Sequence, residues 1–267
     1  MDEEDFYGTG DLLEDPEGYL PPTPPPTKQT FTLGSGKELV LHLVGSSPTE
    51  AHHLWNGAKI ISDFFEKDPS RVRGKTVLEL GAASGLPSLV AGLLGAKRVI
   101  MTDYPDLDLI QNMQKNIDEC DASCETPGHI ADTVKALGFI WGRDSAPLLE
   151  ALNATSGPEA TSQAGSGNKF DVLILADLLF RHSEHGALVK TIKETMRESP
   201  DSVTYVFFTS YRPWKREKDM AFFDVAREAG LKVDNVQETK LDKPLFDNDP
   251  GDLDIQKTVS GFEVRWP

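Results

Sequence analysis

The chain has 267 residues, of which 39% are hydrophobic and 26% are charged, as expected of a folded globular protein. No apolar run approaches the roughly 20 residues that a membrane-spanning helix needs. The acidic start of the chain lacks the basic and apolar regions of a signal peptide. Two cysteines are too few for a disulfide framework, so we expect a reducing, cytoplasmic environment.

The charge balance is strongly acidic. The chain has 27 basic and 43 acidic residues, which gives a net charge of −16. Such a field repels phosphate backbones, so we expect no nucleic-acid partner, and it attracts a basic protein, an amine or a small cation. Solubility alone is the simpler interpretation of the same charge.

The composition divides the chain into an arm and a single domain. Residues 1–28 are acidic and then proline-rich, and such a segment cannot bury enough apolar surface to offset its ordering entropy. We therefore expect a disordered, flexible arm. Residues 29–267 are expected to form one domain that opens with a hairpin at 30–44. A stretch rich in Ser, Ala, Gly and Pro at about 144–168 lacks periodicity and predicts a surface insertion.

Short apolar strands alternate with amphipathic helices through the domain. Strands are predicted at residues 76–80, 98–102, 128–132, 171–176, 203–209 and 261–266. Helices are predicted at residues 52–66, 86–94, 105–119, 184–198 and 217–229. This alternation is typical of an α/β fold with a parallel sheet and helices on its faces.

A glycine-rich turn follows the first core strand, in the sequence LELGAASG at residues 78–85. Ligands of open parallel sheets bind beyond the carboxyl ends of the strands. Gly81 allows the turn to approach a ligand, and Gly85 allows close packing at the start of the helix. Asp103 ends the next strand, where a carboxylate offers two acceptor oxygens to the hydroxyls of a ribose. Together the turn and the acid predict a nucleoside-binding site.

The spacing of the two glycines in this turn limits which nucleoside cofactor the site could bind. The two glycines do not match the G-x-G-x-x-G fingerprint of NAD and FAD sites, and no P-loop sequence is present. The pattern Glu79-x-Gly81-x-Ala83-x-Gly85 resembles the first motif of the seven-strand S-adenosylmethionine-dependent methyltransferases, with Ala83 in place of the middle glycine. That resemblance implies S-adenosylmethionine as cofactor. It also implies a Rossmann-like sheet of seven strands, mostly parallel with an antiparallel last strand, and helices on both faces.

Further segments resemble the protein-lysine methyltransferase branch of this superfamily. They are LWNGA at 54–58, GLPSL at 85–89, FIWG at 139–142 and ADLLF at 176–180, the last matching a D-x-x-[YF] motif. Within the branch, the stretch at 176–185, the acidic arm and the sequence YRP at 211–213 are similar to enzymes that methylate translation elongation factor 1-alpha. Those enzymes modify its N-terminus and an adjacent lysine, and the group was once labelled nicotinamide methyltransferases.

The resemblance implies a role for each matching residue. The cofactor-binding residues would be Trp55, Glu79, Gly81, Ala82, Ala83, Gly85, Asp103, Trp141 and Ala176. Asp103 would bind the ribose, and Trp141 would lie beside the adenine. Glu79 would either face the cationic end of the cofactor or only cap the strand end. Asp177 and Phe180 would be catalytic, Asp177 by holding the amine as its proton leaves and Phe180 by excluding water.

Three hypotheses for the function follow. The first is an S-adenosylmethionine-dependent protein N-methyltransferase, most simply a monomer, that acts on a basic protein, elongation factor 1-alpha. The second is a small-molecule N-methyltransferase that acts on nicotinamide. The third is a non-catalytic binding module on the same fold, against which the intact Asp103 and Asp177 argue.

No metal site is predicted. His182 and His185 flank Glu184 near a helix start, and Cys120 and Cys124 lie four positions apart. Each group has too few ligands for a closed metal site. We expect surface polar roles for the two histidines.

Overall fold

The computed structural model of the chain describes residues 24–154 and 169–267. Most of the predicted arm at 1–28 and the later part of the predicted insertion at 144–168 lie outside these residues. Among the helices that are described, none is long and apolar enough to cross a membrane.

The described residues form nine strands and seven α-helices. The strands are β1 (Thr27–Thr32), β2 (Glu38–Leu43), β3 (Thr76–Leu80), β4 (Arg98–Asp103), β5 (Val134–Gly138), β6 (Val172–Ala176), β7 (Val203–Phe208), β8 (Lys232–Lys240) and β9 (Thr258–Arg265). The helices are α1 (Asn56–Lys67), α2 (Leu86–Leu93), α3 (Leu107–Ala122), α4 (Ala146–Asn153), α5 (His185–Thr195), α6 (Arg216–Glu228) and α7 (Leu253–Gln256). Short 3-10 helices lie at Pro69–Arg71, His182–Glu184 and Pro213–Lys215.

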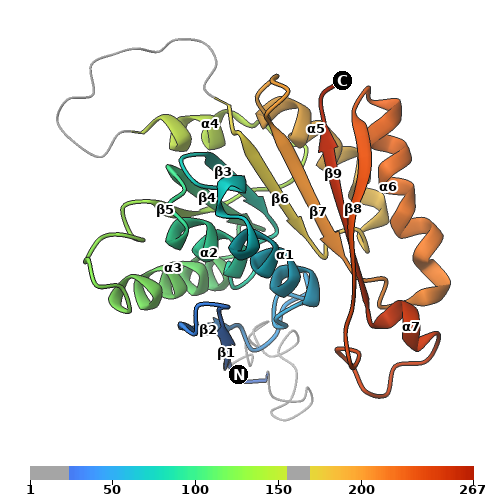
Figure 1. Cartoon of the computed structure of the whole chain (residues 1–267), viewed down its shortest axis with the longest axis horizontal. Coiled ribbons are helices and arrows are strands. Elements are labelled where there is room, and N and C mark those ends of the chain that lie inside the picture. Colours follow the sequence, from blue (N-terminus) through green and yellow to red (C-terminus); the bar gives the residue numbers. More distant parts are fainter. Residues whose placement is uncertain (1–23, 155–168) are drawn as a thin grey trace, which may run out of the picture.

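Seven of the strands form one twisted sheet in the order β5-β4-β3-β6-β7-β9-β8 (Figure 1). The pairs from β5 to β7 are parallel, whereas β9 runs antiparallel to both β7 and β8. This confirms the predicted α/β fold with an antiparallel last strand. β1 and β2 form the predicted hairpin outside the sheet.

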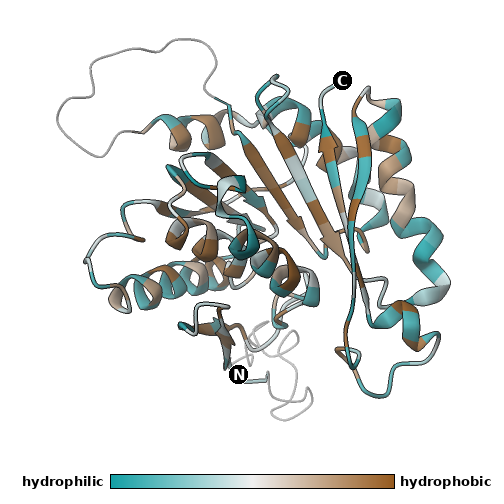
Figure 2. Ribbon diagram, in the orientation of Figure 1, coloured by the Kyte–Doolittle hydropathy of each residue, from teal (hydrophilic) through white to brown (hydrophobic). Residues whose placement is uncertain are grey.

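Helices cover both faces of the sheet. Val77 and Ile174 pack on one face with apolar residues of α1, α2, α3 and the hairpin. Leu78 and Leu175, one position further along each strand, pack on the other face with α4, α5 and α6. Because alternate side chains of a strand point to opposite faces, both faces of β3 and β6 are buried. β6 is a continuous brown run in Figure 2.

The prediction of a strand at 128–132 is wrong, because β5 begins at Val134. The carboxylate of Asp121, at the end of α3, accepts hydrogen bonds from the backbone amides of Gly128, Ile130 and Ala131. Because these amides donate to the Asp121 side chain, the segment is held in turns and its amides are not available to pair with a neighbouring strand.

Three elements have no counterpart in the sequence prediction: β8, α4 and the one-turn helix α7. β8 is an edge strand of mainly exposed polar residues, so it lacks the alternation of apolar residues that marks a strand. α4 lies inside the stretch at 144–168, and its buried residues Leu148 and Leu152 pack against the α5–α6 face of the sheet. At the other end of the chain, β1 begins at Thr27, inside the range 1–28.

Candidate active site

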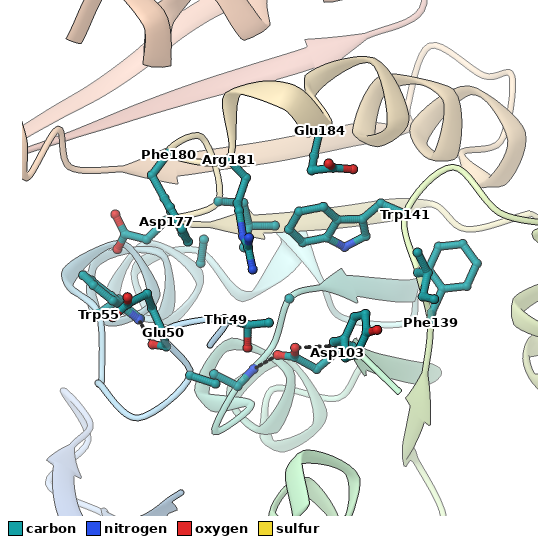
Figure 3. Close-up of a pocket in the computed structure, with 17 residues that line it drawn as sticks. Thr49, Glu50, Trp55, Asp103, Phe139, Trp141, Asp177, Phe180, Arg181 and Glu184 are labelled. Atoms are coloured by element: carbon teal, nitrogen blue, oxygen red, sulfur yellow. Dashed lines mark hydrogen bonds between the residues drawn. The ribbon is translucent and has the colours of Figure 1, made fainter. Parts of the chain in front are cut away.

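A cavity of about 270 Å³ lies at the carboxyl ends of the central strands. Gly81, Asp103 and Ala176, which follow or end β3, β4 and β6, are on its wall. In Figure 3, Trp55 and Asp177 lie at one end of the cavity, and Phe139 and Trp141 lie at the other. This is the edge at which parallel sheets bind their ligands.

Asp103 is a buried acceptor on the wall of this cavity. One carboxylate oxygen accepts a 2.7 Å hydrogen bond from the amide of Ala83, and the other accepts one of 2.7 Å from the amide of Tyr104. Burial raises the pKa of this carboxyl, and the two amides oppose the rise. Each carboxylate oxygen has a second lone pair, so Asp103 can accept two further hydrogen bonds from a diol.

Gly81 keeps the cavity open. Its φ of 63° is in the left-handed region, and a Cβ placed there would lie 2.5 Å from Leu178 Cδ2 and 3.2 Å from Trp141 Cζ2. Any side chain would therefore fill the space between the turn and these two residues. Ala83, in the same turn, also has a positive φ, of 49°, and its amide binds Asp103.

Three of the nine residues predicted to bind the cofactor are not among those that line the cavity: Glu79, Ala82 and Gly85. The Glu79 side chain points to the α2 face, where its carboxylate accepts from the amide (3.0 Å) and the hydroxyl of Ser88. Burial raises the pKa of Glu79 to about 8. Gly85 precedes α2 in the left-handed conformation and packs against Met101.

Asp177, the acid of the D-x-x-F motif, links three parts of the fold. Its Oδ2 accepts from the amide of Gly57 (2.5 Å) and from the hydroxyl of Tyr211 (3.4 Å), and its Oδ1 accepts from the amide of Thr209 (2.8 Å). Trp55 provides no side-chain cap for α1, so Asp177 satisfies one of the free amides of its first turn. Burial raises the pKa of Asp177 to about 7, against the pull of these donors.

A second hollow, of about 470 Å³, adjoins the first cavity. The two share five lining residues: Glu50, Trp55, Asp177, Phe180 and Arg181. The second hollow is otherwise lined by Pro48, Leu179, Phe208, Thr209, Tyr211, Arg212, Asp219, Phe246 and Asp249. A ligand in the first cavity and a ligand in the second would therefore meet at the shared residues. Both predicted catalytic residues, Asp177 and Phe180, belong to this junction.

Several residues of the two hollows were not predicted. Thr49, Glu50 and Ala51 come from the loop between β2 and α1, and their only sequence signal is their nearness to Trp55. Phe139 and Ile140 lie in the FIWG segment, and Tyr211 lies in the YRP segment. The resemblance points to these segments but implies no binding role for these three residues. Asp219 and Phe246 come from distant segments with no recognisable motif.

The histidines near α5 differ from expectation. His185 is buried, and its Nε2 lies 2.8 Å from the carbonyl oxygen of Leu179. His182 Nε2 lies 2.7 Å from Oδ1 of Asp219. The prediction of surface polar roles is therefore wrong for His185, and His182 has a specific carboxylate partner.

One group of side chains in the described residues has the spacing of metal ligands. Glu50, His52 and His53 place one ligand atom each within 4.8 Å of one another. Glu50 and the two histidines are adjacent in one loop, and this group was not considered from the sequence.

A family model described as lysine methyltransferase matches residues 36–229. The chain belongs to the lysine methyltransferase family. This confirms the resemblance that was inferred from the motifs. The matched range includes the glycine-rich turn, Asp103, the D-x-x-F motif and every residue that lines the first cavity.

Curated relatives of this lysine methyltransferase match over nearly its whole length. A Gibberella zeae protein named protein N-terminal and lysine N-methyltransferase EFM7 is 67% identical over 97% of this chain and 96% of that protein. Proteins with the same name from Neurospora crassa and Schizosaccharomyces pombe are 53% and 39% identical. The alignments cover 100% of this chain in both cases, and 91% and 99% of those proteins.

Solved structures agree on the fold. An S-adenosylmethionine-dependent methyltransferase from Streptococcus mutans superimposes with a TM-score of 0.57 and 11% identity, covering 92% of this chain and 57% of that one. A methyltransferase in complex with S-adenosylhomocysteine (SAH) gives a TM-score of 0.51 and 10% identity, covering 88% and 56%.

The first cavity fits S-adenosylmethionine, the cofactor of this lysine methyltransferase. Gly81 leaves room beside the turn, Asp103 has free acceptor sites for the ribose hydroxyls, and Trp141 offers a flat apolar face. When bound, the cofactor supplies a methyl group on a sulfonium.

Proposed function

We propose that this protein transfers methyl groups from S-adenosylmethionine to the N-terminal amine and an adjacent lysine of translation elongation factor 1-alpha, in the cytoplasm. The observation that carries the proposal is the near full-length identity of 67% to a protein named for N-terminal and lysine methylation. The net charge of −16 and the carboxylates of the second hollow suit a basic protein with amines to present.

The junction of the two hollows sets the geometry that methyl transfer requires. An amine must present a neutral lone pair in line with the methyl group, at about 3–3.5 Å. Trp55 and Phe180 line this junction, and their apolar rings would exclude water from it once both ligands are bound. Asp177 keeps one lone pair free on Oδ1 and can accept a hydrogen bond from the incoming amine.

The two proposed acceptors differ in acidity. An N-terminal amine has an ordinary pKa of about 7.7–8.0 and is partly neutral near pH 7, whereas a lysine, at about 10.4, is almost fully protonated. Asp177, whose pKa of about 7 is set mainly by burial, is suited to hold an amine while its proton leaves. Desolvation of a lysine between the rings of Trp55 and Phe180 also favours its neutral form.

A competition assay tests the proposal. Unmodified elongation factor 1-alpha and nicotinamide are offered together with S-adenosylmethionine, and both are read by mass spectrometry. We expect steps of one methyl mass on the N-terminal peptide of the factor. Methylation of nicotinamide alone would show that the acceptor is a small molecule and not the protein. Methylation of neither, with retained cofactor binding, would favour another acceptor or a binding module.

A further inference from the structure

The second hollow contains more carboxylates than the reaction of one amine needs. Glu50, Asp177, Asp219 and Asp249 line it, against the two cations Arg181 and Arg212. The arginines suit the carbonyl oxygens of a bound peptide, because a guanidinium offers only donors. The surplus of carboxylates indicates a ligand that carries more than one ammonium group.

The four carboxylates are not equivalent. Asp177 already accepts three hydrogen bonds from the protein, while Glu50 and Asp249 are exposed. Asp219, in the first turn of α6, is only 5% exposed. Within residues 24–154 and 169–267 its one hydrogen-bond partner is His182, at 2.7 Å through Oδ1, so Oδ2 keeps its acceptor capacity.

An aromatic cluster lies along the same hollow. The ring centroids of Trp55 and Tyr211 are 4.9 Å apart, and Phe246 lies 5.9 Å from each of them. Such rings pack against the methylene stem of a lysine and attract an ammonium group through their faces. The hollow thus combines an apolar path with a buried carboxylate.

We propose that Asp219, oriented by His182, holds the substrate amine that is not reacting. The inference rests on the proposed function, because a substrate with an N-terminal amine and an adjacent lysine brings two ammonium groups to one hollow. When the N-terminal amine is at the junction beside Asp177, the lysine extends along Trp55, Tyr211 and Phe246 toward Asp219. When the lysine reacts, the N-terminal amine takes its place. Asp219 is thus a specificity residue, and His182 is a positioning residue.

The test pairs a variant of the enzyme with a variant of the substrate. Wild-type protein and Asp219→Asn are assayed on full-length elongation factor 1-alpha with an unmodified N-terminus. Both are also assayed on the same factor with the adjacent lysine replaced by methionine. N-terminal methylation is read as kcat and KM. We expect Asp219→Asn to raise KM about tenfold for the lysine-bearing factor, with kcat unchanged, and less than twofold for the methionine-bearing factor.

The chain offers matched controls. Asp224→Asn removes an exposed carboxylate of the same helix, one that pairs with Arg227 at 2.9 Å, and should leave both KM values unchanged. His182→Ala should give the same selective rise in KM that is expected for Asp219→Asn, and His182→Gln, which keeps a donor, should largely restore the wild-type value. This pattern does not depend on how stable any one variant is, because each enzyme is compared on two substrates.

Two outcomes would overturn the role of Asp219 while leaving the proposed function intact. Equal loss on both substrates would place Asp219 at the reacting amine or in the fold, and no loss on either would remove it from substrate binding. If the wild-type protein methylates neither substrate, the proposed function fails, and the inference fails with it.

Discussion

At the scale of single residues, Asp103 carries the cofactor assignment. It is buried at the end of β4, with acceptor sites left after binding the amides of Ala83 and Tyr104. Asp103→Ala is expected to weaken S-adenosylmethionine binding by about 1–3 kcal/mol, because ribose hydrogen bonds are lost. Titration calorimetry measures this, with Asp108→Ala, exposed in α3, as the control. If Asp103→Ala binds S-adenosylmethionine with unchanged affinity, Asp103 does not bind the ribose.

A substitution of Asp177 tests the part of the junction that is proposed to receive the substrate amine. Asp177→Ala is expected to keep cofactor affinity while losing turnover. It should also lower the free energy of unfolding by about 2–4 kcal/mol, because the amides of Gly57 and Thr209 lose their acceptor. Calorimetric binding, initial rates and denaturant unfolding separate the three effects. Turnover near the wild-type rate would exclude Asp177 from the reaction.

The sequence predicts these residues unequally. The glycine-rich turn, Asp103 and Asp177 stand at strand ends, which local patterns locate. The role of Glu79 depends on which face of β3 it occupies, and its partner Ser88 lies in a helix that covers that face. The pairing of His182 with Asp219 joins elements 37 positions apart and has no local signal.

At the scale of elements, the start of α1 is fixed from outside the helix. Gly57 is its second residue, and a Cβ there would lie 2.6 Å from both Asp177 Oδ2 and the carbonyl oxygen of Phe207. Gly57→Ala is therefore expected to destabilise the fold by at least about 1–3 kcal/mol, despite the better helix propensity of alanine.

Gly186 provides the matched control for this change. It is the second residue of α5, and a Cβ there would meet nothing within 4 Å. Gly186→Ala should leave stability unchanged or raise it by up to about 1 kcal/mol. Urea unfolding of both variants measures the difference, and equal effects would contradict the close packing of α1 against Asp177.

The predictability of the elements follows their burial. The central strands and the helices α1, α2, α3, α5 and α6 show clear apolar patterns, because each has a face on the core. β8 lies at the sheet edge with polar side chains on both sides, so hydrophobic alternation is absent there. β5 was misplaced because the turns before it depend on Asp121, a contact between segments that apolar periodicity does not reveal.

At the scale of the whole molecule, buried carboxyls couple stability to pH. Burial raises the pKa of Glu79 to about 8 and that of Asp177 to about 7, above their ordinary values of 4.5 and 3.8. At a pH between the ordinary and the raised pKa of each carboxyl, the folded state keeps a proton that the unfolded state has released. The stability they contribute is present at low pH and is lost as pH rises, by at most about 1.4 kcal/mol per pH unit for each group.

Thermal unfolding checks this sign. The Tm of the cofactor-free protein is expected to fall between pH 5.5 and pH 8 by more than that of Glu79→Gln, which cannot ionise. Glu228→Gln, exposed at the end of α6, should behave as the wild type does. An equal fall in Glu79→Gln and in the wild type would show that Glu79 is already ionised in the folded protein across this range.

The most direct test of the joined hollows is an experimental structure with S-adenosylhomocysteine and the N-terminal peptide of elongation factor 1-alpha bound together. We expect the cofactor product between Asp103 and Trp141, and an amine nitrogen at the junction of Trp55 and Phe180, about 5 Å from the sulfur. A peptide bound outside the second hollow, or an amine far from the sulfur, would contradict methyl transfer across this junction.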